Sequence, residues 1–143
     1  MTNVADLLKA KPSRMVAIKP QDTVLDAVKL MATENIGAAI VMNGDKLVGI
    51  LSERDYARKV VLMGRSSETT LVEEIMTANV ICVSPRTKSR DCMALMSEKN
   101  IRHLPVVDNG RVVGMVSVRD IVADIIADQD FTISQLEQYI SGQ

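Results

Sequence analysis

Apolar residues in the first third of the chain follow first a strand pattern and then a helix pattern. Residues 16–19 are mostly apolar and read as a short strand, which Pro20 ends. From residue 24 to residue 31 the apolar positions recur with the i, i+3, i+4, i+7 spacing of an amphipathic helix. Asp22 and Thr23 precede this stretch, and either one suits the N-cap of the helix.

A β-hairpin and a second helix are predicted next. The apolar runs 36–42 and 47–51 flank the turn-forming residues 43–45, Asn-Gly-Asp, which is a hairpin pattern. Ser52 then begins a helix that ends near Gly64. We expect the inner face of this helix to carry Tyr56, Ala57, Val60 and Val61. The order of elements is therefore β-α-β-β-α.

The same order returns later in the chain. Residues 81–126 align with residues 16–61 without a gap, and 12 of the 46 aligned positions are identical. Between the copies lie a polar linker, 64–70, and a short helical turn, 71–76. Each copy is too small to bury both faces of its sheet. The predicted fold is therefore a single α/β (α+β) module over residues 1–143, in which two β-α-β-β-α repeats pack about a pseudo-twofold axis with a cleft between them.

Short helices are predicted at both ends of the chain. Residues 4–8 favour a helix, followed by a linker that contains Pro12 and Ser13. Near the other end, residues 132–135 form a capping-box pattern for a separate helix over 131–141. Its apolar stripe consists of Ile133, Leu136, Tyr139 and Ile140. Such a stripe either packs on its own domain or forms a contact with a second copy or another partner.

The composition narrows the function. The formal net charge is −1 and the pI about 5.8, which argues against binding to nucleic acid or to an anionic membrane through overall charge. Signal-peptide and membrane-spanning patterns are absent from the sequence, so we expect a cytoplasmic protein without membrane contact. Cys82 and Cys92 lie in apolar patterns without metal-ligand spacing, and we expect both thiols to be buried.

The repeated segment 49–55, which returns at 114–120, carries the candidate chemistry. In each copy a glycine and two apolar residues lead to a serine, and an arginine and an aspartate follow in the first helical turn. A carboxylate accepts hydrogen bonds from both hydroxyls of a ribose, and a helix N-terminus with an arginine suits a phosphate. Ser-x-x-Asp is also an ordinary capping box, and the two roles can coexist in one serine.

Other chemistry finds little support. His103 is the single histidine, so catalytic or metal sites built on several histidines are excluded, and it is either a half-buried strand residue or a phosphate contact. The sequence contains no glycine-rich phosphate loop and no pattern for a nucleophile with its base. We therefore expect no catalytic residues, no metal and no required cofactor.

At the two Gly-x-x-Ser-x-Arg-Asp segments, and at residues 101–108, Ile-Arg-His-Leu-Pro-Val-Val-Asp, the sequence resembles the CBS domain family, named after cystathionine β-synthase. The resemblance covers nearly the whole chain. The chain is also similar to the small stand-alone proteins of this family, which consist of one tandem pair and a short C-terminal helix. Residues 75–77 are typical of the family, whereas 11–13 depart from its pattern. The resemblance implies a module that binds AMP, ADP, ATP, NAD or S-adenosylmethionine between the repeats and that commonly forms a homodimer.

Carried over from the family, each site combines the Ser-x-x-Asp segment of one repeat with strand residues of the other. The first site would combine Ser117, Arg119 and Asp120 with Val16, Ile36, Gly37 and Ala38. The second would combine Ser52, Arg54 and Asp55 with Thr77, Ile81, Ile101, Arg102 and His103. Because Arg102 and His103 replace the neutral Gly37 and Ala38, we expect phosphate charge mainly at the second site.

Two functions follow from these observations. The first is a non-enzymatic sensor, in which AMP, NAD or ATP in the cleft changes the packing of the repeats or subunits and so regulates a protein partner that the sequence does not identify. The alternative is a ligand-independent module for dimerisation and assembly.

Overall fold

The computed structural model describes residues 2–10 and 15–141, and the chain divides into two compact units. The N-terminal unit consists of Arg14–Ile81, and the C-terminal unit combines Met1–Ser13 with Cys82–Gln143. The N-terminal unit contains the first predicted repeat, and the C-terminal unit contains the second except for its first residue, Ile81. The linker residues Pro12 and Ser13 lie outside the described residues.

The N-terminal unit contains the predicted strand, helix and hairpin. Strand β1 (Ala17–Ile18) is parallel to β2 (Ala38–Asn43), which is antiparallel to β3 (Lys46–Ser52). Helix α2 (Val24–Glu34) connects β1 to β2. Of the two N-cap candidates, Thr23 is the observed cap, because its hydroxyl oxygen accepts a hydrogen bond from the Asp26 amide at 3.2 Å.

Both repeats end their first long helix in the same way. Asn35 and Asn100 are the C-cap residues of α2 and α5 (Ser89–Lys99), and both adopt the left-handed conformation, with φ of 55° and 54°. Asparagine tolerates this conformation better than most residues and commonly ends helices. This explains why an asparagine appears at the same place in both repeats.

The helix after β3 differs in part from the prediction. It begins as α3 (Glu53–Tyr56) and continues as the π-helical turn η1 (Ala57–Val61). Val60 is buried, whereas Ala57 and Val61 are exposed, so their prediction as inner-face residues is wrong. A helical turn, α4 (Val72–Ile75), follows the linker as predicted. The buried core of this unit consists of Ile18, Val24, Ala27, Met31, Ala39, Val41, Leu51, Val60, Val72 and Ile75.

The C-terminal unit contains α1 (Val4–Ala10), α5, and an antiparallel hairpin of β4 (His103–Asp108) and β5 (Arg111–Ser117). The predicted first strand of this repeat is reduced to a single parallel bridge between Val83 and Val106. Two backbone hydrogen bonds support this bridge, from Val83 N to Pro105 O and from Val107 N to Val83 O. The sheet therefore has two strands where three were expected.

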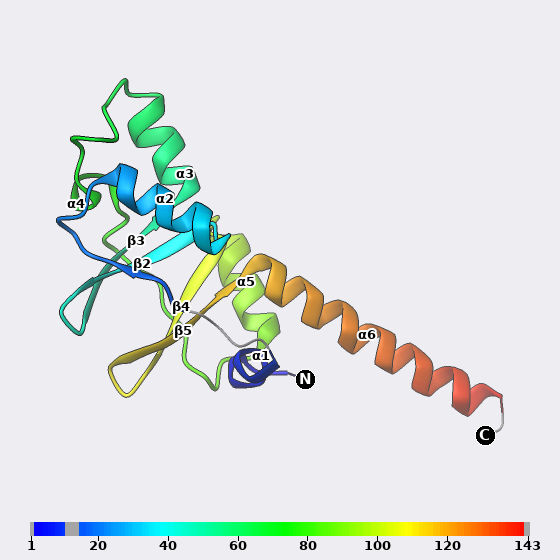
Figure 1. Ribbon diagram of the computed structural model, residues 1–143. Helices are drawn as coiled ribbons and strands as arrows, with labels where there is room; N and C mark the ends of the chain where they lie inside the picture. The colour runs from blue at the N-terminus through cyan, green and yellow to red at the C-terminus, as the bar shows by residue number, and fades with distance from the viewer. Residues whose placement is uncertain (1, 11–14, 142–143) are drawn as a thin grey trace. The chain divides into compact units, whose positions relative to one another are not determined.

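Helix α6 (Val118–Ile140) follows β5 and runs without a break (Figure 1). The prediction of a separate helix that begins near residue 131 is wrong. The Thr132 hydroxyl donates a hydrogen bond to the Asp128 carbonyl one turn earlier, as it does inside a helix and not at an N-cap. From Ile126 to the end of the helix every residue is exposed.

The thiols differ from the prediction. Cys92 on α5 is buried, but Cys82 is exposed, so the expectation of two buried thiols is wrong for Cys82.

Among the described residues, none of the helices combines the length and apolar character needed to cross a membrane. Within the same part of the chain, no group of three or more His, Cys, Asp or Glu residues is placed to hold a metal ion.

Candidate ligand-binding sites

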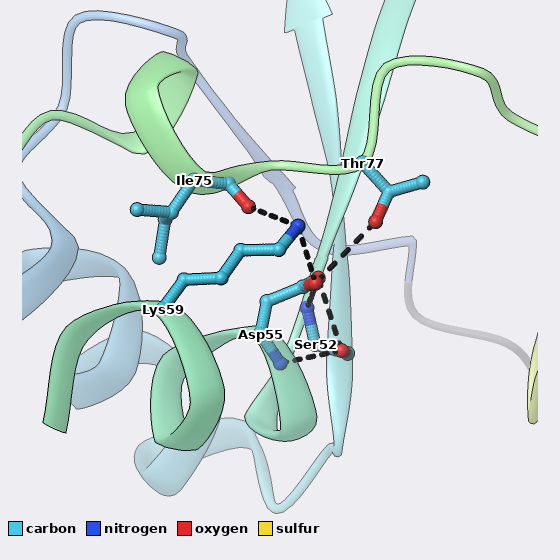
Figure 2. A network of polar contacts seen from close by, with 5 residues as sticks. All are labelled: Ser52, Asp55, Lys59, Ile75 and Thr77. Atoms are coloured by element: carbon cyan, nitrogen blue, oxygen red, sulfur yellow. Dashed lines mark hydrogen bonds and ion pairs between the residues drawn. The ribbon is translucent and has the colours of Figure 1, made fainter. Parts of the chain in front are cut away.

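The Ser-x-x-Asp segment of the N-terminal unit forms a complete capping box (Figure 2). Ser52 ends β3 in an extended conformation, and its hydroxyl oxygen accepts a hydrogen bond from the Asp55 amide at 3.1 Å. In return, the Ser52 amide donates to Asp55 Oδ2 at 3.0 Å. Two of the amides at the helix start are thereby satisfied.

Gly49 allows the chain that follows α4 to approach this segment. A β-carbon at Gly49 would lie 2.6 Å from Met76 Sδ and 3.1 Å from the Thr77 carbonyl oxygen, closer than van der Waals contact allows. Ile50 and Thr77 exchange two backbone hydrogen bonds, of 3.0 and 2.9 Å. This pairing brings the Thr77 hydroxyl to Asp55 Oδ1, at 3.4 Å. The predicted site residues Ser52, Asp55 and Thr77 therefore lie together.

Lys59 also reaches Asp55, and the sequence prediction missed it. Its ammonium lies 3.1 Å from Asp55 Oδ1 and donates a hydrogen bond to the Ile75 carbonyl oxygen at 3.0 Å (Figure 2). The sequence holds a signal for this contact, since an aspartate and a lysine four residues apart face each other on a helix. The aligned position in the second repeat carries Asp124.

Several predicted strand residues lie beside the Ser-x-x-Asp segment of their own repeat. Ala38 pairs with Ser52 across β2 and β3, and the Glu53 amide donates to the Gly37 carbonyl at 3.0 Å. The Val16 carbonyl accepts from the Ile40 amide at 3.1 Å. Ile36, Arg54 and Ile81, which are partly buried, belong to the same unit.

The C-terminal unit repeats this arrangement. The Ser117 hydroxyl oxygen accepts from the Asp120 amide at 3.2 Å, and the Ser117 amide donates to Asp120 Oδ2 at 2.9 Å. His103 pairs with Ser117 across β4 and β5, and the Val118 amide donates to the Arg102 carbonyl at 2.9 Å. Arg119 is exposed, and Ile101 is partly buried next to Arg102.

A cavity of about 280 Å³ lies next to Asp120 in this unit. It is bordered by α1, the end of β5 and the first turns of α6, and its wall is mostly apolar. An apolar cavity with a carboxylate in its wall suits the base and sugar of a nucleoside. The residues that line it are Leu7, Leu8, Ala10, Met115, Val116, Asp120, Ala123 and Asp124.

Thr77 and Ile81 belong to the same unit as Ser52. The rest of the predicted pairing of each Ser-x-x-Asp segment with strands of the other repeat joins residues of different units, and it stays a prediction. Each unit carries one copy of the capping-box arrangement, so the class of protein is a tandem α+β repeat protein. In each repeat a serine-capped helix follows the hairpin and carries arginine and aspartate in its first turn.

This chain belongs to the CBS domain family. A model of that family, described as the CBS domain, matches residues 4–62 and 72–127. The chain is 39% identical over 150 residues to the mitochondrial CBS domain-containing protein CBSX3 of Arabidopsis thaliana, and the match covers 99% of this chain and 73% of that protein.

Two solved structures show the same fold. A protein with CBS domains from Burkholderia ambifaria is 53% identical and superposes with a TM-score of 0.86 over 90% of this chain and 96% of its own. The CBS domain pair of protein MJ0100, solved in complex with 5′-methylthioadenosine and S-adenosyl-L-methionine, is 32% identical with a TM-score of 0.79, over 90% of this chain and 98% of its own. CBS domain pairs are in general regulatory modules that bind adenosine-containing ligands.

Proposed function

We propose that this protein is a non-enzymatic sensor that binds an adenosine-containing ligand, AMP, NAD or ATP. Ligand binding then changes how the protein regulates a partner protein. The observation that carries the proposal is the mostly apolar cavity that Asp120 lines at the start of α6. The complex of the related MJ0100 pair with two adenosine compounds supports it.

The chemistry of the segment fits such a ligand. A carboxylate can accept hydrogen bonds from both ribose hydroxyls, and this distinguishes ribose from deoxyribose. Helix α6 is long enough to present a developed partial positive charge at its N-terminus, where Arg119 adds a cation. Arg102 and His103 lie beside Ser117 and Val118 in this unit, so we propose them as phosphate contacts at this cavity and not at the second site, to which the family resemblance assigns them.

Thermal unfolding in the presence of AMP, ATP, NAD and 5′-methylthioadenosine tests this proposal. A ligand at one hundred times its Kd should stabilise the fold by about 2.7 kcal/mol. 2′-Deoxyadenosine 5′-monophosphate and GMP serve as matched controls, and we expect them to stabilise less than AMP. If none of the adenosine compounds moves the melting curve at millimolar concentration, the proposal is wrong.

The exposed face of α6 favours a second candidate function, assembly of a homodimer. Past α1 and α5 the helix runs on to Ile140 (Figure 1), and every residue from Ile126 onward is exposed, yet one of its faces is apolar. Long helices owe most of their stability to packing of such a face, so we propose that a second copy covers it. The residues of this stripe are Val122, Ile126, Ile133, Leu136 and Ile140, which are all exposed.

Light scattering after gel filtration tests the assembly function. We expect a dimer for the parent protein and a monomer for Leu136→Asp, whereas Gln138→Asp, which adds the same charge on the opposite face of α6, should stay dimeric. A parent protein that is monomeric at all concentrations, or equal behaviour of the two variants, would contradict this role.

The location of the protein stays a prediction. The sequence favours the cytoplasm, but the similar Arabidopsis protein is named mitochondrial. Immunofluorescence of the tagged protein in its own cell would test it, and co-purification from the same cells would search for the regulated partner.

A further inference from the structure

The exposed stripe of α6 follows a seven-residue repeat. Its members alternate in steps of four and three residues along the helix, which is the spacing of the a and d positions in a coiled coil. Each a or d position of such a helix packs between residues of a facing helix. The a positions are Ile126, Ile133 and Ile140, and the d positions are Val122, Gln129 and Leu136, all of which are exposed.

The residue types in this seam indicate which partner covers it. Isoleucine at a together with leucine at d favours parallel coiled coils of two strands. All three a positions of the stripe are isoleucine, and the d position between the last two is Leu136. In a parallel pair without axial shift, each layer meets the same layer of the other helix, so the seam is complementary to itself. The partner that fits it is therefore a second copy of this chain.

Gln129 is the single polar residue among the six positions of the seam. In a parallel pair without axial shift it would face Gln129 of the second copy, and two amides can satisfy each other because each has donors and an acceptor. In an antiparallel pair a positions face d positions, so Gln129 would face Ile133 and would leave its amide unsatisfied in an apolar layer. A polar residue at one position of the seam thus selects both direction and register.

The charges beside the seam favour the same direction. The e positions carry Asp130 and Glu137, whereas the g positions Ile125, Thr132 and Tyr139 are uncharged. In a parallel pair each e position faces a g position of the other helix, so no like charges meet. In the antiparallel register that overlaps the whole stripe, e positions face each other, and Asp130 would face Asp130 of the second copy. Like charges at this distance oppose association.

The beginning of α6 is held by its own unit. It packs against α5 and α1, and Ile121 in its first turns is completely buried. The helix therefore forms before association, and a second copy does not have to order a free peptide. A seam shorter than that of a free coiled coil is sufficient for this reason.

We propose that two copies of the protein associate through α6 as a parallel, in-register, two-stranded coiled coil. This inference rests on the homodimer of the proposed assembly function and adds the direction and register of its helices. A parallel pair places the starts of both α6 helices, and with them the cavities that they border, at the same end of the coiled coil.

Disulfide cross-linking tests the direction of the helices. In a Cys82→Ser background, which removes the exposed native thiol, Leu136→Cys places two thiols in one layer of a parallel pair, within reach of a disulfide. In the antiparallel register described above, residue 136 faces residue 126, so these thiols would lie about 15 Å apart along the axis. With diamide as oxidant, we expect Leu136→Cys to cross-link at least about tenfold faster than Gln138→Cys on the opposite face of α6.

Two variants with tags of different mass, Ile126→Cys and Leu136→Cys in the same background, provide the complementary experiment. Parallel pairing predicts cross-links between equal variants, and preferential cross-linking between the two different variants would overturn the inference. Slow cross-linking of Leu136→Cys in a protein that is dimeric by light scattering would also overturn it, while the homodimer would stand. If the Cys82→Ser protein is monomeric at all concentrations, the proposed homodimer fails and this geometry fails with it.

Sedimentation equilibrium of Gln129→Leu tests the seam without cross-linking. We expect the dimer dissociation constant to fall at least about fivefold, because an apolar layer replaces a polar one. Gln135→Leu, at an exposed position outside the seam, is the matched control and should change the dissociation constant by less than about twofold. Equal effects of the two variants would show that Gln129 does not lie in the interface and would overturn the inference.

Discussion

Gly49 lies against Met76, so closely that a β-carbon on Gly49 would come within 2.6 Å of the Met76 sulfur and 3.1 Å of the Thr77 carbonyl oxygen. The glycine of the repeated segment is therefore required by a close approach of two chain segments, since no positive φ is recorded for it. The approach sets the distance between Thr77 and Asp55 in the candidate site.

Replacing Gly49 by alanine should destabilise the protein by about 1–3 kcal/mol, because the added methyl group overpacks the contact with Met76 and Thr77. The free energy of unfolding in urea measures this. In a Met76→Ala background the cost of Gly49→Ala should become smaller, since the side chain that obstructs most closely is gone. An equal cost in both backgrounds would show that the Met76 contact is not the cause.

Removing a capping serine should also cost stability, by about 1 kcal/mol for Ser117→Ala, because the Asp120 amide loses its acceptor. The loss for Ser52→Ala should be larger, because the Ser52 hydroxyl also donates to Asp55 Oδ2 at 3.0 Å. Urea unfolding of both variants checks the order. Ser141→Ala, near the exposed end of the chain, is the control and should change little. A cost for Ser117→Ala that exceeds the cost for Ser52→Ala would refute this order.

The sequence predicted those features that depend on local patterns. Helix α2, the hairpins and the serine caps follow from apolar spacing, turn residues and side-chain hydrogen bonds within a few positions. The alignment of residues 16–61 with residues 81–126 also predicted that the second half of the chain contains the same elements as the first.

Features that depend on contacts between distant segments were not predicted. The position of the Lys59 ammonium involves the Ile75 carbonyl at the end of α4, sixteen residues away along the chain, and no local pattern predicted the π-helical turn that carries it. The strand expected near Val83 is reduced to a bridge to Val106, and Cys82 beside it is exposed. The capping-box pattern at 132–135 does not begin a helix, because these residues lie in the interior of the longer helix α6.

Replacement by alanine should lower the free energy of unfolding much more at a buried leucine than at an exposed one. Leu51 on β3 is completely buried in the core of the N-terminal unit, whereas Leu62 after η1 is 76% exposed. Leu51→Ala should lower the free energy of unfolding by about 2–5 kcal/mol, because it leaves a cavity. Leu62→Ala should change it by less than about 0.5 kcal/mol in the monomer. A large cost for Leu62→Ala that grows with protein concentration would instead place Leu62 in a subunit contact.

The two cysteines should react at different rates. Cys92 is buried, and burial, with a smaller contribution from Asp91, raises the pKa of its thiol from 9.0 to about 11. At pH 8.5 iodoacetamide should therefore modify the exposed Cys82 first and should modify Cys92 only after unfolding. Mass spectrometry of the digested protein measures both rates, and equal rates in the folded protein would contradict the burial of Cys92.

The same shift predicts a loss of stability in alkaline solution. The pKa of Cys92 is higher in the folded state than in the unfolded state, so its protonated thiol favours folding below about pH 9, and this contribution is lost as the pH rises towards 11. The free energy of unfolding should fall over this range, and it should fall less steeply for Cys92→Ala than for the parent protein. The slope is the informative quantity, because the alanine also leaves a small cavity that lowers stability at every pH. Parallel slopes for the two proteins would show that Cys92 does not control the alkaline loss of stability.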